Sequence, residues 1–220
     1  RNSNILINNH MATLKLNSQT VITESSGTLT APALNITTGT LASGVTLPAN
    51  HVVQVKQQKS AVHQEITGNI NTMVNISSLN TSITIGSNNK VLVQGMISFA
   101  SDYWAMGLKI KRGINTSTLS EVDDSKGDNT GYTGQKEVMT AMQCATTGGG
   151  FHHDEMSQIN FSYLDSPAQS SSSTIHYGVF VHSRGTGSQT IQINSAYDYD
   201  DNSIYILKGI STLTLTEIQS

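Results

Sequence analysis

The stretch Ser157–Arg184, SQINFSYLDSPAQSSSSTIHYGVFVHSR, decides the fold. Apolar and aromatic residues occupy alternate positions in both of its halves: Ile159, Phe161 and Tyr163, then Ile175, Tyr177, Val179 and Val181. A period of two with β-branched and aromatic residues is typical of half-buried strands. Asp165-Ser166-Pro167 ends the first strand, because proline has no N–H to give to a sheet. The stretch therefore predicts a β-hairpin with a long, serine-rich loop, on which the rest of the chain packs its strands.

The same strand pattern recurs along the chain. Further strands are predicted at 12–21, 52–58, 70–77, 82–85, 90–100, 104–112, 189–194, 203–207 and 211–218. The expected core of the head is Val91, Val93, Ile97, Phe99, Leu108, Ile110, Val179 and Val181. Residues 114–155 are rich in Gly and Asp and only weakly periodic, and are expected to be mostly loop. Many short strands separated by turns predict an all-β protein with a β-sandwich or jelly-roll-like head.

Composition excludes several classes of function. Only 12% of the 220 residues are charged and the formal net charge is −3, which argues against a nucleic-acid-binding protein. The longest apolar runs are too short to cross a bilayer, so no membrane insertion is expected. The single cysteine, Cys144, excludes a framework of intrachain disulfides.

The N-terminal part differs from the rest of the chain in its amino-acid composition. Between Ser25 and Pro48, apolar residues stand singly among Thr, Gly and Ser, so this segment cannot bury a core by itself. A stem intertwined with copies of itself would solve that problem, whereas the alternative is a flexible linker. We therefore expect an N-terminal attachment segment and β stem over residues 1–50, a β-sandwich head over residues 51–220, and a homotrimer.

Seven short motifs carry a resemblance to a known family. In chain order they are Met11–Asn17 (MATLKLN), 46–49 (TLPA), Val52–Gln57 (VVQVKQ), Lys90–Gln94 (KVLVQ), Gly107–Gly113 (GLKIKRG), Leu164–Pro167 (LDSP) and Gly209–Ile218 (GISTLTLTEI). Together they resemble virion proteins of tailed phages, especially marine and cyanobacterial ones, known as tail-fibre or minor structural proteins. The resemblance implies a trimeric β head on a stem that attaches to the virion. The loop 117–155 and the loop around Tyr197 depart from it, so the specificity of the family cannot be carried over.

The sequence offers no catalytic constellation. It has no Gly-rich phosphate loop after a strand, no nucleophile elbow and no pair of thiolates. We therefore expect the protein not to be an enzyme and to need no cofactor.

Two segments have spacings that suit a metal ion. Asp198, Asp200 and Asn202 have the alternating spacing that begins a Ca²⁺ loop, but the closing Glu is missing and Gly209 stands in its place. The alternative for these residues is an Asp-rich turn. His152-His153 could provide one ligand per chain to a ring on a threefold axis, and the alternative is a solvated loop.

Receptor specificity is expected in two irregular loops, Ser117–Glu155 and Ser195–Asn202. Aromatic rings give a large contact area at low entropic cost, and loops on a rigid sandwich are the usual place for binding sites. The candidate receptor- or partner-binding residues are Tyr132, Phe151, His152, His153, Tyr197 and Tyr199. In a second interpretation, these aromatic residues join neighbouring subunits.

The predicted function is a virion-located attachment protein of the tail-fibre type. Residues 1–50 are expected to contact other virion proteins, and the head loops a host-surface glycan or protein. The alternatives are a capsid-bound head fibre or decoration protein with the same fold, and a soluble glycan-binding module.

Overall fold

A computed structural model of the chain describes ten ranges of residues: 13–16, 19–25, 28–30, 49–68, 73–101, 105–127, 138–143, 156–183, 189–196 and 207–220. The chain divides into two compact units, Arg1–Thr46 and Leu47–Ser220. In the first unit, β1 (Thr13–Leu16), β2 (Gln19–Ser25) and β3 (Thr28–Thr30) form a three-stranded antiparallel sheet in that order. No helix in the described ranges is long and apolar enough to cross a membrane.

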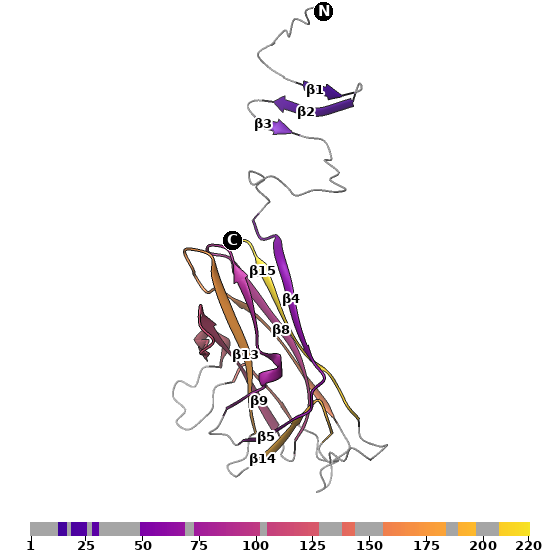
Figure 1. The fold of residues 1–220 in the computed structure, drawn as a ribbon, viewed down its shortest axis with the longest axis vertical. Coiled ribbons are helices and arrows are strands. Elements are labelled where there is room, and N and C mark those ends of the chain that lie inside the picture. The colour runs from indigo at the N-terminus through magenta and orange to yellow at the C-terminus, as the bar shows by residue number, and fades with distance from the viewer. Residues whose placement is uncertain are drawn as a thin grey trace, which may run out of the picture. The chain divides into compact units, whose positions relative to one another are not determined.

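The second unit, the head, contains two antiparallel sheets (Figure 1). The β8 sheet consists of β4 (Val52–Ser60), β5 (Gln64–Gly68), β8 (Lys90–Ser101), β12 (Ser157–Asp165), β14 (Gln189–Ile193) and β15 (Ser211–Ile218). The β9 sheet consists of β6 (Val74–Asn75), β7 (Thr81–Ile85), β9 (Ala105–Ile114), β10 (Ser120–Glu121), β11 (Thr140–Gln143) and β13 (Ser173–Ser183). Two short 3₁₀ turns, η1 (Ser77–Leu79) and η2 (Asp123–Ser125), complete the described elements.

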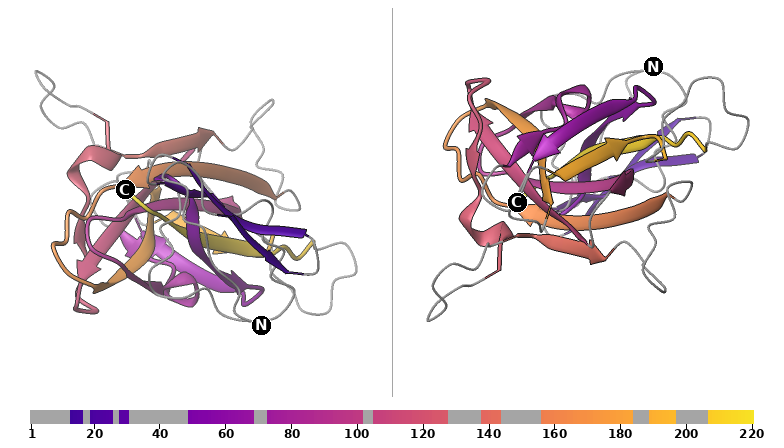
Figure 2. Two further views of the ribbon diagram at one scale, coloured as in Figure 1. Left: turned by 90° about the horizontal axis from the view of Figure 1, so that it is seen from above. Right: turned by 90° about the horizontal axis from the view of Figure 1, so that it is seen from below.

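Each sheet is organised around long central strands. In the β8 sheet, β8 pairs with β12 on one side and with β15 and β14 on the other. Beyond them, β4 pairs with β15 and β5 with β14, so β15 lies between β4 and β8. In the β9 sheet, β9 pairs with β13, β10 and β11 flank β9, and β7 and β6 flank β13. Figure 2 shows the molecule from above and below.

One apolar cluster joins the inward faces of the two sheets and confirms the predicted sandwich. All eight residues expected in the core belong to this cluster, and each is at most 1% exposed. Ile175 and Tyr177 of β13 and Leu213 and Leu215 of β15 are fully buried with them. The all-β fold class and the alternation of β8, β9 and β13 could therefore be predicted from the sequence.

The predicted hairpin over Ser157–Arg184 is wrong. Both of its strands form, but β12 pairs with β8 and β13 pairs with β9, so the two strands lie in different sheets. The loop of residues 166–172 carries the chain from one sheet to the other as an arch. The two strands are not joined by a ladder of backbone hydrogen bonds. Instead, the side chains of Asp165 in β12 and Tyr177 in β13 are hydrogen-bonded to each other, as described below.

Elsewhere, the structure shortens or adds to the expected strands in three places. The strand predicted over 70–77 is reduced in the described part to Val74–Asn75, after which Ile76 is buried and η1 begins. The stretch 114–155 contains β10, η2 and β11 as well as loop. Strand β5, with Ile66 in the core, was not predicted. The strand predicted at 203–207 falls mostly outside the described residues.

Candidate interaction surfaces

All the residues that the sequence singled out for binding fall outside the described ranges. This applies to the six receptor-binding candidates, Tyr132, Phe151, His152, His153, Tyr197 and Tyr199. It applies equally to the three calcium-binding candidates, Asp198, Asp200 and Asn202. These assignments stay predictions, and the surfaces described below are built from other residues.

The loop that follows β9 is held tightly against the β9 sheet. Asn115 has a positive φ of 53°, and its backbone N–H donates to the Thr174 carbonyl at 2.8 Å. In return, the Thr174 N–H donates to Asn115 Oδ1 at 2.9 Å. A Cβ at Gly113 would lie 2.3 Å from the Thr116 carbonyl oxygen, so only glycine allows the loop to fold back this closely. Residues 115–119 are therefore fixed relative to β13.

This fixed loop forms one wall of a polar pocket of about 370 Å³. Ser117 and Leu119 come from the loop, and His176 comes from β13 beside them. The remaining lining is Lys56 and Gln58 from β4, Asn80, Thr81 and Ser82 at the start of β7, and Tyr177. Gly178 makes room for this wall, because a Cβ there would lie 2.6 Å from both Asn80 Oδ1 and Leu119 Cδ1. The glycine thus lets Asn80 and Leu119 approach the sheet.

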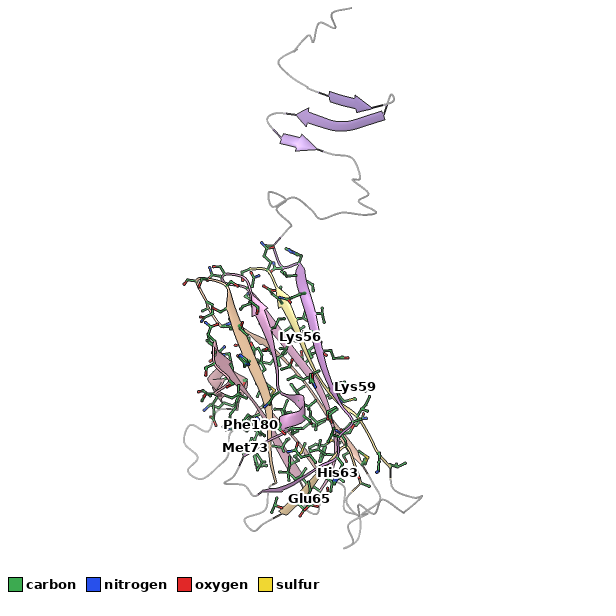
Figure 3. The ribbon with its side chains drawn as sticks, in the orientation of Figure 1. Lys56, Lys59, His63, Glu65, Met73 and Phe180 are labelled. Carbon is green, nitrogen blue, oxygen red and sulfur yellow. The ribbon has the colours of Figure 1, made fainter. Side chains whose placement is uncertain are left out.

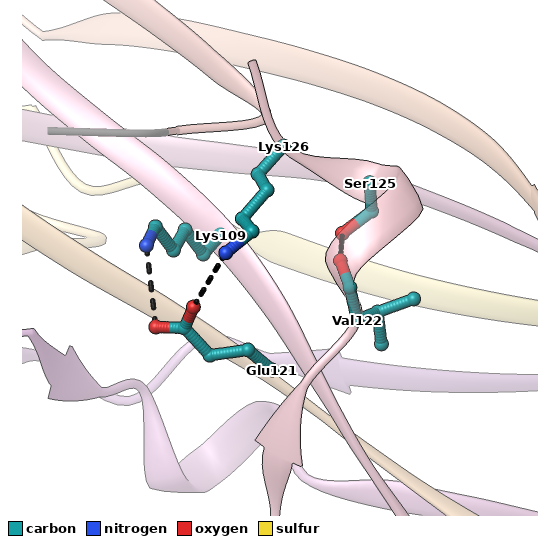
Figure 4. Close-up of polar contacts among 5 residues, drawn as sticks. All are labelled: Lys109, Glu121, Val122, Ser125 and Lys126. Carbon is teal, nitrogen blue, oxygen red and sulfur yellow. Dashed lines mark hydrogen bonds and ion pairs between the residues drawn. The ribbon is translucent and has the colours of Figure 1, made fainter. Parts of the chain in front are cut away.

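The outer face of the β9 sheet is partly covered by its own charged and apolar side chains. Glu121 accepts from Lys109 at 3.2 Å and from Lys126 at 3.4 Å (Figure 4). Partial burial of Glu121 disfavours its charged form, but hydrogen bonds and attraction from the two ammonium groups outweigh this effect and lower the pKa of the carboxyl. Lys111 lies 4.6 Å from the ring centroid of Phe180, a cation–π contact. The cationic side chains of this face are thus matched within the chain.

The outer face of the β8 sheet carries three rows of side chains across four strands, β12, β8, β15 and β4. The strand registers place these rows side by side: Leu164–Leu92–Thr216–Val55, Ser162–Gln94–Thr214–Gln57 and Asn160–Met96–Thr212–Lys59. The first row has exposed apolar residues at both ends, since Leu164 is 46% and Val55 61% exposed. The three rows contain no carboxylate, and Lys59 is their one charged residue. We call these twelve residues the open face.

Strand β4, which contributes one side of the open face, is an edge strand of its sheet. Within the described residues it pairs with β15 alone, and Val52 and Val53 beside the open face are 55% and 47% exposed. Successive residues of a strand point to opposite faces, so Val55 faces the open face while Lys56 faces the polar pocket. An edge strand with exposed valines can pair with a strand of another chain, and soluble monomers usually avoid such edges.

A buried ionic cluster stabilises the arch between the two sheets. Asp165, at the end of β12, is 2% exposed. Its Oδ1 lies 2.5 Å from Arg112 Nη1 of β9, and its Oδ2 accepts a hydrogen bond of 2.6 Å from the Tyr177 hydroxyl of β13. All three groups satisfy one another, so we interpret the cluster as structural.

The cluster predicts a loss of stability at high pH. Burial raises the pKa of the Tyr177 hydroxyl, and the Asp165 carboxylate raises it further against an opposing effect of Arg112. A raised pKa favours the neutral phenol in the folded state. The resulting stabilisation is complete below the ordinary tyrosine pKa of about 10 and is lost as the pH rises above it. Between pH 9 and about 11, we expect the thermal midpoint of the wild type to fall more steeply than that of Tyr177→Phe; parallel curves would contradict this.

The described residues do not bring together a set of side chains that could hold a metal ion. No group of three His, Cys, Asp or Glu side chains in these ranges could hold a metal ion. His63 and Glu65 do not form a direct pair in these bonds, because Gln192 bridges them. Its Oε1 lies 2.5 Å from His63 Nε2, and its Nε2 donates to Glu65 Oε2 at 3.0 Å. Both residues are labelled in Figure 3.

The comparisons with known proteins give only a distant likeness. No protein-family model matches the chain, and no curated protein matches it. Among solved structures, it is similar to that of the infectious bursal disease virus Gt strain, with 12% identity, a TM-score of 0.34 and coverage of 86% of this chain and 42% of the other. The VP2 subviral particle of the same virus is similar at 11% identity, with a TM-score of 0.32 and coverage of 86% and 42%. The chain spans less than half the length of these structures.

Proposed function

We propose that this protein is a virion structural protein of the attachment type, whose heads assemble as a homotrimer. In this proposal, residues 1–50 attach the protein to other virion proteins, and the head faces the host. Support comes from the resemblance of the seven sequence motifs to tail-fibre and minor structural proteins of tailed phages. Further support comes from the architecture, a small N-terminal sheet followed by a β-sandwich, which suits a stem and a head.

The open face is the observation that carries the assembly part of the proposal. Four strands about 4.8 Å apart, each contributing a stretch of five residues to the three rows, cover roughly 300 Å² per copy. A standard interface buries about 800 Å² per partner, so the trimer contact would also include neighbouring exposed residues such as Val52 and Val53 of β4. Without carboxylates, the face offers no charge complementarity to a basic partner. Around a threefold axis, the Leu164 end of the first row in one copy would meet the Val55 end in the next. Such a head-to-tail contact closes into a ring.

Light scattering on the full-length chain tests the assembly. We expect a mass about three times the 23.6 kDa of one chain. The double variant Val55→Lys, Leu164→Lys should give the monomer mass, because burying several like charges in one interface costs several kcal/mol. The matched control is Val62→Lys, which places a lysine at a 64% exposed valine outside the open face and should leave the trimer intact.

Two results would contradict the assembly: a wild type that scatters as a monomer, or a double variant that stays trimeric. Circular dichroism should show unchanged strand content in all variants, since the substituted side chains are exposed. A fold defect is thereby separated from an assembly defect.

The virion location requires a separate experiment. Gold-labelled antibodies against the head, applied to purified particles of a phage that encodes this chain, should label the tail. Label on the capsid would instead support a head fibre or decoration protein of the same fold. Particles without label would overturn the virion role and favour a soluble glycan-binding module.

A further inference from the structure

The polar pocket beside β4 has the composition of a small-molecule site that none of the sequence motifs indicated. Its volume of about 370 Å³ lies in the range of ligand pockets. The pocket is formed within one chain, on the side of β4 opposite to the open face. Its lining therefore needs no residue from a second copy. The inference deepens the proposed attachment role by giving the head a ligand class, and rests on that role only for its biological setting.

The lining groups are nearly all uncharged hydrogen-bonding groups. Thr81, Ser82 and Ser117 supply hydroxyls, which both donate and accept. Asn80 and Gln58 supply amides. The Gln58 Nε2 donates to the Ser78 carbonyl at 3.1 Å, which fixes the orientation of the Gln58 side chain. A dense set of groups that both donate and accept is complementary to a ligand with several hydroxyls.

Lys56 adds a single positive charge to this set. Within the described part of the chain, its ammonium group has no carboxylate partner, and the pocket lining contains no Asp or Glu. Lys109 and Lys126 instead pair with Glu121, and Lys111 lies over Phe180. Lys59, like Lys56, is in no described ion pair, but it lies on the opposite face of β4 and outside the pocket. One unmatched cation among neutral groups suits a ligand with one negative charge.

The pocket walls are preformed. The reciprocal Asn115–Thr174 bonds fix the loop that presents Ser117 and Leu119. Gly178 leaves the space that Asn80 and Leu119 occupy. Leu119 is the one aliphatic side chain of the lining, and it provides an apolar patch for the C–H groups of a ring. Preformed walls reduce the entropic cost of binding.

From these observations we propose that the pocket binds the carboxylated sugar unit of an acidic glycan, a uronic acid. Lys56 binds the carboxylate, Asn80 and Ser82 bind ring hydroxyls, and Leu119 contacts the apolar face of the ring. His176 borders the same space and adds a nitrogen for hydrogen bonding. The ligand is thus recognised by its charge and its hydroxyls together.

Titration calorimetry on the full-length chain tests this assignment with galacturonate, galactose and inorganic phosphate as probes. We expect galacturonate to bind about tenfold more tightly than galactose, and Lys56→Gln to remove that tenfold preference, because a charge-assisted bond is about twice as strong as a neutral one. Asn80→Ala should weaken both sugars by a similar factor of roughly five. Both substituted side chains are exposed, so the fold should be kept.

The matched control is Lys59→Gln. Lys59 lies on the same strand three residues from Lys56 (Figure 3) and belongs to the open face, so its loss should change galacturonate affinity less than twofold. Equal losses in Lys56→Gln and Lys59→Gln, or no binding by the folded wild type, would overturn the proposal. So would phosphate that competes as strongly as galacturonate, since this would indicate an anion site without sugar recognition. Light scattering on the same samples reports assembly separately, so a failed pocket and a failed trimer are distinguishable.

Discussion

Phe99→Ala is expected to lower the free energy of unfolding by about 3–5 kcal/mol, the usual cost of removing a large aromatic side chain from a core. Phe99 is fully buried in β8. It is paired with Ser157 of β12 on one side and with Ile193 of β14 on the other. Because it lies between two neighbouring strands and faces the opposite sheet, the surrounding structure cannot collapse into the space that is left.

Urea denaturation followed by circular dichroism measures this effect. The control is Val62→Ala, which removes apolar atoms from a side chain that is 64% exposed and should cost less than about 0.5 kcal/mol. An unchanged denaturation midpoint for Phe99→Ala would mean that the inward phase of β8 is wrong, and with it the core.

Asp165→Ala is expected to destabilise the head by a similar amount, about 3–5 kcal/mol, because it leaves a partly buried charge without its partner. The Arg112 guanidinium would lose its counter-charge and the Tyr177 hydroxyl its acceptor. Since Arg112 belongs to β9 and Tyr177 to β13, the substitution also removes the polar link between the end of β12 and the opposite sheet.

Glu121→Ala provides the comparison, because it also removes a carboxylate from an ion pair. Glu121 is 39% exposed, and surface pairs contribute about 0–1 kcal/mol. Thermal unfolding at pH 7 should therefore separate the two variants clearly. Equal midpoints would show that Asp165 is not a buried anchor and that the arch is held by other contacts.

The sequence predicted what depends on local alternation and missed what depends on partner choice. Val91, Val93, Ile97 and Phe99 recur with a period of two and are all buried, as expected. The same period is present whether neighbouring strands pair with each other or with different sheets. The hairpin assignment for 157–184 failed for this reason. A loop as long as 166–172 exceeds the usual two to five residues of a hairpin and was the available sign of an arch.

The polar pocket could not be predicted from the sequence. Lys56 and His176 are far apart in the chain, and only the pairing of β4, β7 and β13 with their neighbours brings them to one cavity. The open face could have been predicted in part. Val55, in the predicted strand 52–58, and Leu164, in the predicted strand that ends at Asp165, were both apolar residues at which an exposed contact could have been considered. What joins them into one row is the register across four strands, which no local pattern contains.

The position of β15 affects how the head folds while the chain is being synthesised. Of the described strands, β15 is made last, yet it lies between β4 and β8, and β4 has no other described partner. Until β15 has been synthesised, the backbone groups of β4 that would bond to it have no described partner strand. Such a strand is a site for aggregation and for chaperone binding until the sheet closes. A prematurely terminated chain that lacks residues 211–218 cannot close the β8 sheet or present a finished open face. Completion of the β8 sheet thus depends on β15.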